Sequence, residues 1–350
     1  MKTLGVIGLS LAIIVSTSTV SASSADEVGT DSSMISKPVS IVASEISPQS
    51  IWSDGLYAKV SWENLDPKLV RESAYRQVLA RLRASKPMGD SWIHIHTKNA
   101  DPKLSANTRA DLKKMIGFYS NIKYVKDYTV IWAHPKDFKT LPKLLCDKFQ
   151  FCEKLKPKDY CEVNYRADFE VNCYPKSDTS HLMQMFNQHG FTHFIQERAS
   201  QPGVPYGPNW FIEGTASYLG LFFGKLPQNG AADVGAYLSW AKDSIYEDQT
   251  AVRFAKPATR KNFIDGMIQS AKHGEKDAES SYILGYYLGS LATEVLIAVY
   301  GYDKFVEFFK SLEREEFYKS FERHFGLDHL AFYDKMASYA VYRFKTDNPF

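Results

Sequence analysis

The sequence predicts an α+β protein in which a small mixed sheet with helices, over residues 51–178, precedes a mainly helical part, over residues 179–350. Three observations predict this order. Short apolar segments typical of strands alternate with helical patterns up to about residue 174. After residue 178 the apolar residues recur at helical spacing. Two histidines four residues apart, followed by a glutamate on the next predicted helix, also lie in this second part.

Residues 1–22 have the pattern of a cleaved secretory signal peptide. Lys2 gives a positive start, residues 4–15 are mostly apolar, and Val20-Ser21-Ala22 offers small residues for cleavage. A retained membrane anchor is the alternative, but the apolar run is shorter than the ~20 residues that a spanning helix needs. We therefore expect a secreted or periplasmic protein. Residues 23–50, rich in Ser, Asp and Pro, are expected to form a disordered tether.

The composition argues against two classes of partner. The chain has 42 basic and 40 acidic residues, so it lacks the basic field of a nucleic-acid-binding protein. Residues 282–300 are strongly apolar, but Glu294 and several Gly and Ser residues favour a buried core helix over a membrane span. We expect no nucleic-acid partner and no stable membrane span once the signal peptide is cleaved.

The four cysteines, Cys146, Cys152, Cys161 and Cys173, lie close together in the sequence. An exported protein meets an oxidising compartment, which favours two disulfides. A zinc site is the alternative, but the spacing contains no C-x-x-C pair. Four cysteines allow 3 pairings, and the sequence does not choose among them.

In the first part, helical patterns alternate with strand patterns. The helical patterns cover residues 66–84, where Asp66-Pro67 is a typical helix start, and residues 105–120. Strands are predicted for residues 92–97, 128–133 and 169–173. In the second part, helices are predicted for residues 179–198, 211–223, 234–242, 281–300, 302–312 and 327–343.

The predicted helix at residues 179–198 carries His189 and His193. Side chains at i and i+4 share one helix face, with Cβ atoms about 5–6 Å apart, so two imidazoles there can bind one zinc ion. Two polar residues on a half-buried helix would show the same spacing, so the pair needs support. Glu213, at the start of the next predicted helix, can supply the third protein ligand.

These residues resemble the site of the gluzincin zinc metallopeptidases, which include the aminopeptidase N-like and thermolysin-like enzymes. In aminopeptidase-like members, H-E-x-x-H is followed on a later helix by W-x-x-E-G-x-A. His189, His193 and Glu213 match the zinc ligands of that pattern, and the framing residues that match are Trp210, Gly214 and Ala216. The resemblance implies a zincin-like metallopeptidase fold, one bound zinc ion and a peptide or protein ligand.

Gly190 departs from the family's pattern, which has a glutamate at this position. That glutamate takes a proton from zinc-bound water, and general acid–base catalysis is typically worth roughly 10²–10⁴-fold. Glu197 points in a similar direction but lies about 10 Å further along the helix, at about 1.5 Å per residue. No catalytic base is therefore assigned. The resemblance offers Tyr282 as an oxyanion stabiliser; Tyr286 and Tyr287 are equally placed, and core packing is the alternative.

Three functions follow from these residues. The first is an exported zinc-binding, gluzincin-like protein that has weak or no proteolytic activity and binds a peptide or another ligand. The second is an active zinc metallopeptidase or hydrolase whose base is distant in sequence. The third is a metal-free structural or interaction protein in which hydrogen bonds join His189, His193 and Glu213. Whether the protein is an enzyme is left open by the sequence.

Overall fold

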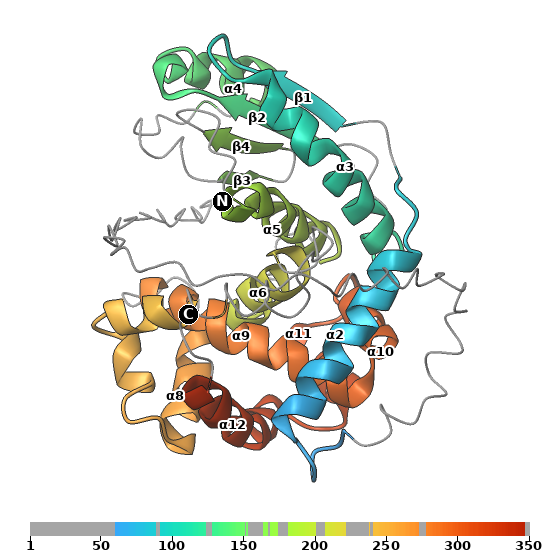
Figure 1. Ribbon diagram of the computed structural model, residues 1–350, viewed down its shortest axis with the longest axis vertical. Coiled ribbons are helices and arrows are strands. Elements are labelled where there is room, and N and C mark those ends of the chain that lie inside the picture. Colours follow the sequence, from blue (N-terminus) through green and yellow to red (C-terminus); the bar gives the residue numbers. More distant parts are fainter. Residues whose placement is uncertain are drawn as a thin grey trace, which may run out of the picture.

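The helices and the sheet appear in the predicted order. The computed structural model describes residues 60–88, 92–123, 128–150, 152, 164–166, 169–173, 181–200, 207–221, 238, 241–272 and 278–346. A small sheet lies at one end of the molecule, and most of the other described residues are helical (Figure 1). The predicted signal peptide and tether, residues 1–50, lie outside the described residues.

The α-helices account for most of the fold. They are α2 (Pro67–Ala84), α3 (Pro102–Tyr119), α4 (Leu141–Phe149), α5 (His181–Arg198), α6 (Asn209–Thr215), α8 (Arg260–Ser270), α9 (Ala278–Tyr300), α10 (Tyr302–Ser311), α11 (Phe317–Phe325) and α12 (His329–Thr346). The predictions located α2, α3, α5, α9, α10 and α12, but they missed the short helices α4, α8 and α11.

Two of the predicted helices need correction. The segment predicted as one helix over residues 211–223 is α6 followed by a π-helix over Ala216–Leu221, with the remaining residues outside the described part. A π-helix is a rare departure from the 3.6-residue period, so a pattern based on that period does not reveal it. Of the predicted helix 234–242, the described residues 238, 241 and 242 are helical, and the helical residues continue to 247.

The sheet is mixed, with the strand order β1–β2–β4–β3. The strands are β1 (Trp92–His96), β2 (Tyr128–Ala133), β3 (Asn164–Arg166) and β4 (Phe169–Cys173). β1, β2 and β4 pair in parallel, and β3 pairs antiparallel to β4. The three longer strands are the predicted ones, whereas β3 is too short for an alternating pattern to reveal it.

Every residue of β2 is buried, because helices cover both faces of the sheet. On one face, Ile131 packs with Leu141 and Leu145 of α4. On the other face, the ring of Tyr128 lies 5.2 Å from that of Phe191 in α5. A strand buried on both sides reads as a continuous apolar run. The sheet therefore serves as the platform against which α5 packs.

The helix α2 precedes the sheet in sequence but packs against α9 (Figure 1). Asp66 caps it by accepting a hydrogen bond from the Leu69 amide at 2.9 Å. Gln77 donates to the Ile297 carbonyl at 3.2 Å and accepts from the Tyr302 amide at 2.8 Å. The N-terminal helix is thus tied to the C-terminal helices, and the predicted subdomain boundary at residue 178 stays a prediction.

The apolar helix α9 lies largely in the protein core. Its segment Ser280–Tyr300 is the one segment among the described residues that is long and apolar enough to cross a membrane. However, 78% of its most apolar stretch is buried inside the protein. Glu294, in this segment, forms a buried ion pair with Arg343 of α12. Both features fit the expected core helix.

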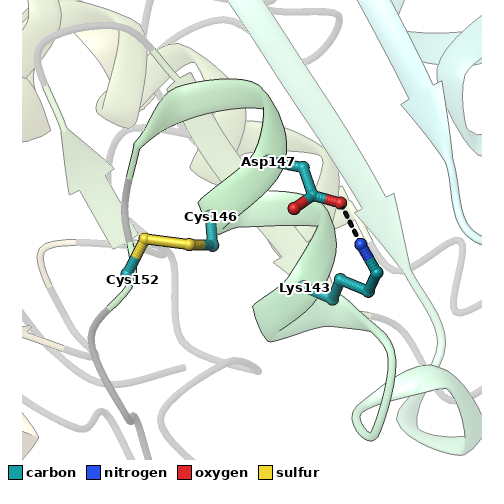
Figure 2. The surroundings of a disulfide bond; sticks show 4 residues. All are labelled: Lys143, Cys146, Asp147 and Cys152. Carbon is teal, nitrogen blue, oxygen red and sulfur yellow. Dashed lines mark hydrogen bonds and ion pairs between the residues drawn. A yellow bond between two sulfur atoms is a disulfide. The ribbon is translucent and has the colours of Figure 1, made fainter.

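A disulfide joins Cys146, in α4, to Cys152 (Figure 2). It spans the end of the helix, close to an ion pair between Lys143 and Asp147 (Figure 2). One predicted disulfide is therefore present. Cys161 lies outside the described residues, so a second disulfide stays a prediction.

The helices α6 and α9 cross at very short range. A Cβ atom at Gly289 would lie 2.0 Å from the Trp210 carbonyl oxygen, and one at Gly214 would lie 2.1 Å from the Gly289 carbonyl carbon. No side chain fits at either point without moving a helix backbone. Glu213 lies on α6 between these contacts, so its position depends on them.

Replacing Gly289 with alanine should therefore destabilise the protein. Overpacking a tight core costs about 1–3 kcal/mol or more, and here the obstacle is backbone rather than a flexible side chain. Gly266→Ala on α8 is the matched control, since its Cβ would meet only side-chain atoms, at 3.1 and 3.2 Å. Thermal or urea unfolding should show a clear loss for Gly289→Ala and a small change for Gly266→Ala; equal losses would contradict the close crossing.

Candidate metal centre

Three side chains from two helices converge on one point. His189 and His193 come from α5, and Glu213 comes from α6. The two Nε2 atoms lie 2.9 Å apart, and each lies 3.4 Å from Oε2 of Glu213. All three side chains are buried, with no more than 6% of any residue exposed. The structure thus brings together the three ligands predicted from the sequence.

Two of the three distances fit a shared metal ion, and the third is short enough for a hydrogen bond between the two imidazoles. In a tetrahedral zinc site with Zn–N bonds of about 2.0–2.1 Å, neighbouring ligand atoms lie about 3.3–3.4 Å apart. The distances between the three ligand atoms here are 2.9, 3.4 and 3.4 Å. Contacts of 3.4 Å are longer than ordinary N–H···O bonds of about 2.7–3.2 Å, as expected for atoms that share a third partner. These residues can hold a metal ion.

The protonation states also suit a metal. Burial and the adjacent His193 lower the pKa of His189, and they outweigh the upward effects of Glu213 and the Ala216 carbonyl. Burial by itself raises the pKa of Glu213, but His193 and His189 outweigh it and lower this pKa to about 2. At neutral pH, His189 is therefore uncharged and Glu213 is ionised. Metal ligation requires these forms.

The orientation of α5 follows from its two faces. Phe191 and Phe194 are buried, and their rings lie 5.2 and 4.7 Å from that of Tyr128 in the sheet. With these rings held against the sheet, the face that carries His189 and His193 turns toward α6. The four-residue spacing keeps both imidazoles on that face.

The start of α6 is held by hydrogen bonds to α9 and to the segment that follows α8. Pro208 precedes the helix in an extended conformation, and its carbonyl accepts the first bonds of the turn. Asn209 donates to the Lys272 carbonyl and to the Ser281 hydroxyl, both at 3.0 Å. The first turn of α6 is thus fixed, and Glu213 follows one turn later.

The π-helix after α6 lies directly against α5. A Cβ atom at Gly220 would lie 2.7 Å from the Gln188 carbonyl oxygen and 2.8 Å from the Cα atom of His189. Ala216, the first residue of the π-helix, interacts with the His189 imidazole through its carbonyl. π-Helical turns occur frequently at functional sites. This one couples the helix of Glu213 to the first histidine.

Glu197 does not take the place of the glutamate that the gluzincin pattern has at position 190. Gly190 is buried in α5 beside His189, whereas Glu197 is exposed at the end of the same helix. Among the described residues, the group that can hold a metal contains Glu213 as its one carboxylate. Glu213 belongs to the group of three residues that could hold a metal, so the general base stays unassigned.

The three candidate tyrosines of α9 have different surroundings. Tyr287 is fully buried, and its ring lies 5.7 Å from that of Phe344, which is core packing. The ring of Tyr286 lies 5.9 Å from that of His189. Burial raises the pKa of the half-buried Tyr282, and the charge of Glu213 raises it further. Tyr282 and Tyr286 therefore lie beside the site, and an oxyanion-stabilising role for Tyr282 stays a prediction.

Gln196 is a site residue that the sequence analysis missed. It is buried, and its Oε1 lies 2.8 Å from Nδ1 of His193. The available signal was its position three residues after His193, which places it near that side chain on a helix. The gluzincin motif includes no glutamine at this position, and a spacing of three residues from His193 was not enough to identify Gln196 as a site residue.

The purified protein should contain about one metal ion per chain, and His193→Ala should remove it. Losing one of three protein ligands leaves too few to hold the ion against a chelator. The control is His134→Ala, because His134 lies at the end of β2 and its Nδ1 accepts from the Lys136 amide. Elemental analysis of the three proteins would contradict the site if the wild type were metal-free or if His193→Ala kept its metal.

Comparison with protein families, with characterised proteins and with solved structures gave no match. The family resemblance consequently rests on the sequence motif, and the structure adds one independent fact to it. The three residues that the motif assigns as ligands form a buried group that can hold a metal.

Proposed function

We propose that the protein is an exported zinc-binding, gluzincin-like protein that binds a peptide or another ligand at its metal and has weak or no proteolytic activity. One observation carries this proposal. The ligand set His189, His193 and Glu213 is assembled and buried, while the position of the family's base is occupied by Gly190. The proposal thus separates metal binding from acid–base catalysis.

The two halves of such a site depend on different residues. Holding an ion needs three converging donor atoms, and these lie within 3.4 Å of one another. Hydrolysis also needs a group that accepts a proton from the attacking water. A bound zinc ion would itself lower the pKa of a coordinated water and polarise a carbonyl. Glycine at position 190 contributes no proton acceptor, so the proton transfer is the part that is weakened.

The residues around His189, His193 and Glu213 support the binding of a peptide or another molecule beside the metal. Three protein ligands leave a fourth position of a tetrahedral ion open. Tyr286 packs against His189, and Tyr282 lies near enough to Glu213 for its pKa to be raised by that charge. Both tyrosines are partly exposed. A peptide carbonyl or carboxylate is a ligand group that suits an ion with phenol groups beside it.

An active hydrolase is the second candidate, and Tyr282 is the observation that favours it. The charge of Glu213 acts on the half-buried phenol of Tyr282, and a phenol near a metal ligand can donate a hydrogen bond to a developing oxyanion. Its pKa is raised, so it keeps its proton at neutral pH. This candidate requires a base distant in sequence or a substrate whose cleavage needs none.

Gly190→Glu is the experiment that separates the two candidates. If the site is a metallopeptidase site without its base, the substitution should raise peptidase activity by roughly 10²–10⁴-fold over the wild type. The measurement is cleavage of a broad peptide library by zinc-loaded proteins. Activity in the wild type that a chelator removes, and that Gly190→Glu does not increase, would contradict the proposal and favour the second candidate.

Gly190→Gln is the matched control for this experiment. Glutamine introduces a side chain of the same size into the same buried position but accepts a proton far less readily. Zinc content and thermal unfolding of both variants show whether the site has survived the added volume. An equal gain in activity for Gly190→Gln would show that added bulk, rather than the carboxylate, is responsible.

A further inference from the structure

Gln196 contacts both helices that supply the ligands. Its Oε1 lies 2.8 Å from Nδ1 of His193, and its Nε2 donates to the Ile212 carbonyl at 3.0 Å. Ile212 directly precedes Glu213 in α6. Only 1% of Gln196 is exposed. One buried amide therefore joins the second histidine to the turn of α6 that carries the carboxylate.

The contact with Ile212 determines which way round the amide lies. A backbone carbonyl can accept hydrogen bonds but cannot donate them. The NH₂ group of Gln196 must therefore face Ile212, and its oxygen must face His193. If the amide were flipped, Oε1 of Gln196 would face the Ile212 carbonyl oxygen, and neither atom could donate a hydrogen bond to the other.

The amide orientation in turn determines the tautomer of His193. The oxygen of Gln196 can only accept, so Nδ1 of His193 carries the proton and donates it. In a neutral imidazole, the other nitrogen then keeps its lone pair. This nitrogen is Nε2, the atom that lies 2.9 Å from Nε2 of His189 and 3.4 Å from Oε2 of Glu213. The lone pair therefore points at the place where the three ligand atoms converge.

We propose that Gln196 is a positioning residue of the metal centre, which holds His193 as the Nδ1-protonated tautomer and fixes its imidazole relative to Glu213. The metal-related half of this inference rests on the proposed zinc-binding function. The tautomer half concerns the protein without metal as well. Partners of this kind orient metal-ligating histidines, and their loss typically weakens metal affinity by about 10–100-fold.

Two substitutions separate the contacts of Gln196. Gln196→Leu removes both the acceptor for His193 and the donor for Ile212. Gln196→Glu keeps an acceptor for His193 and, when ionised, has no donor for Ile212. Thr192→Val is the control, because Thr192 is buried on the same helix and its hydroxyl contacts Tyr119 at 2.7 Å rather than a ligand.

The first measurement is the zinc dissociation constant, obtained by competition with a chromophoric chelator. Gln196→Leu should bind zinc about 10–100-fold more weakly than the wild type. Gln196→Glu should lose less affinity than Gln196→Leu, since it preserves the contact with Nδ1. Thr192→Val should lose stability but keep its zinc affinity. Wild-type affinity in Gln196→Leu, or an equal loss in Thr192→Val, would overturn the proposal.

The second measurement is the imidazole tautomer of His193 in the metal-free protein, from nitrogen-15 spectra of histidine-labelled samples. The wild type and Gln196→Glu should both show His193 protonated at Nδ1, and Gln196→Leu should lose this preference. A wild-type His193 protonated at Nε2 would overturn the proposal even if no variant folds. A wild type that takes up no zinc would contradict the proposed function, and these spectra would still decide the role of Gln196.

Discussion

The close packing of α6 between α5 and α9 is the constraint on which the metal centre depends. On one side, Gly214 of α6 and Gly289 of α9 bring two helix backbones into contact. On the other side, Gly220 in the π-helix does the same against α5, beside His189. A single added methyl group at any of these points would push helices apart. Glu213 reaches the two histidines because both contacts hold.

This packing also explains how a buried, charged site is tolerated. An ionised carboxylate buried without partners would be costly, but two imidazoles offset the burial of Glu213 and hold its pKa at about 2. The same environment keeps His189 neutral. The centre is therefore arranged electrostatically for a cation, independently of the residue at position 190. Metal binding and catalysis can consequently be lost or kept separately in such a fold.

The grouping of the three candidate ligands could be predicted because side chains at i and i+4 lie on the same face of a helix. His189 and His193 share a face at i and i+4, and Glu213 was recognisable from Trp210 and Gly214 around it. The longer helices and strands were predictable for the same reason: each has an apolar pattern over several turns or residues. The order of sheet and helices followed from these patterns.

Most of the features that the sequence did not reveal are short, irregular or formed by tertiary contacts. β3 is too short to show an alternating pattern, and α4 and α11 have only 9 residues each. α8 has 11 residues, one more than the predicted α10, so its length does not explain why it was missed. The π-helix breaks the period altogether. The role of Gln196 depends on the Ile212 carbonyl, sixteen residues away, and that contact exists only once α5 and α6 have packed. The different surroundings of Tyr282, Tyr286 and Tyr287 likewise come from neighbours on other helices.

The central claim is that two histidines and one carboxylate hold the ion, with no cysteine among the ligands. Zinc K-edge X-ray absorption of the purified protein tests it most directly. The account predicts a first shell of nitrogen and oxygen atoms at about 2.0–2.2 Å, with the outer scattering of two imidazoles. Sulfur scatterers at about 2.3 Å, or a shell with no imidazole contribution, would contradict it.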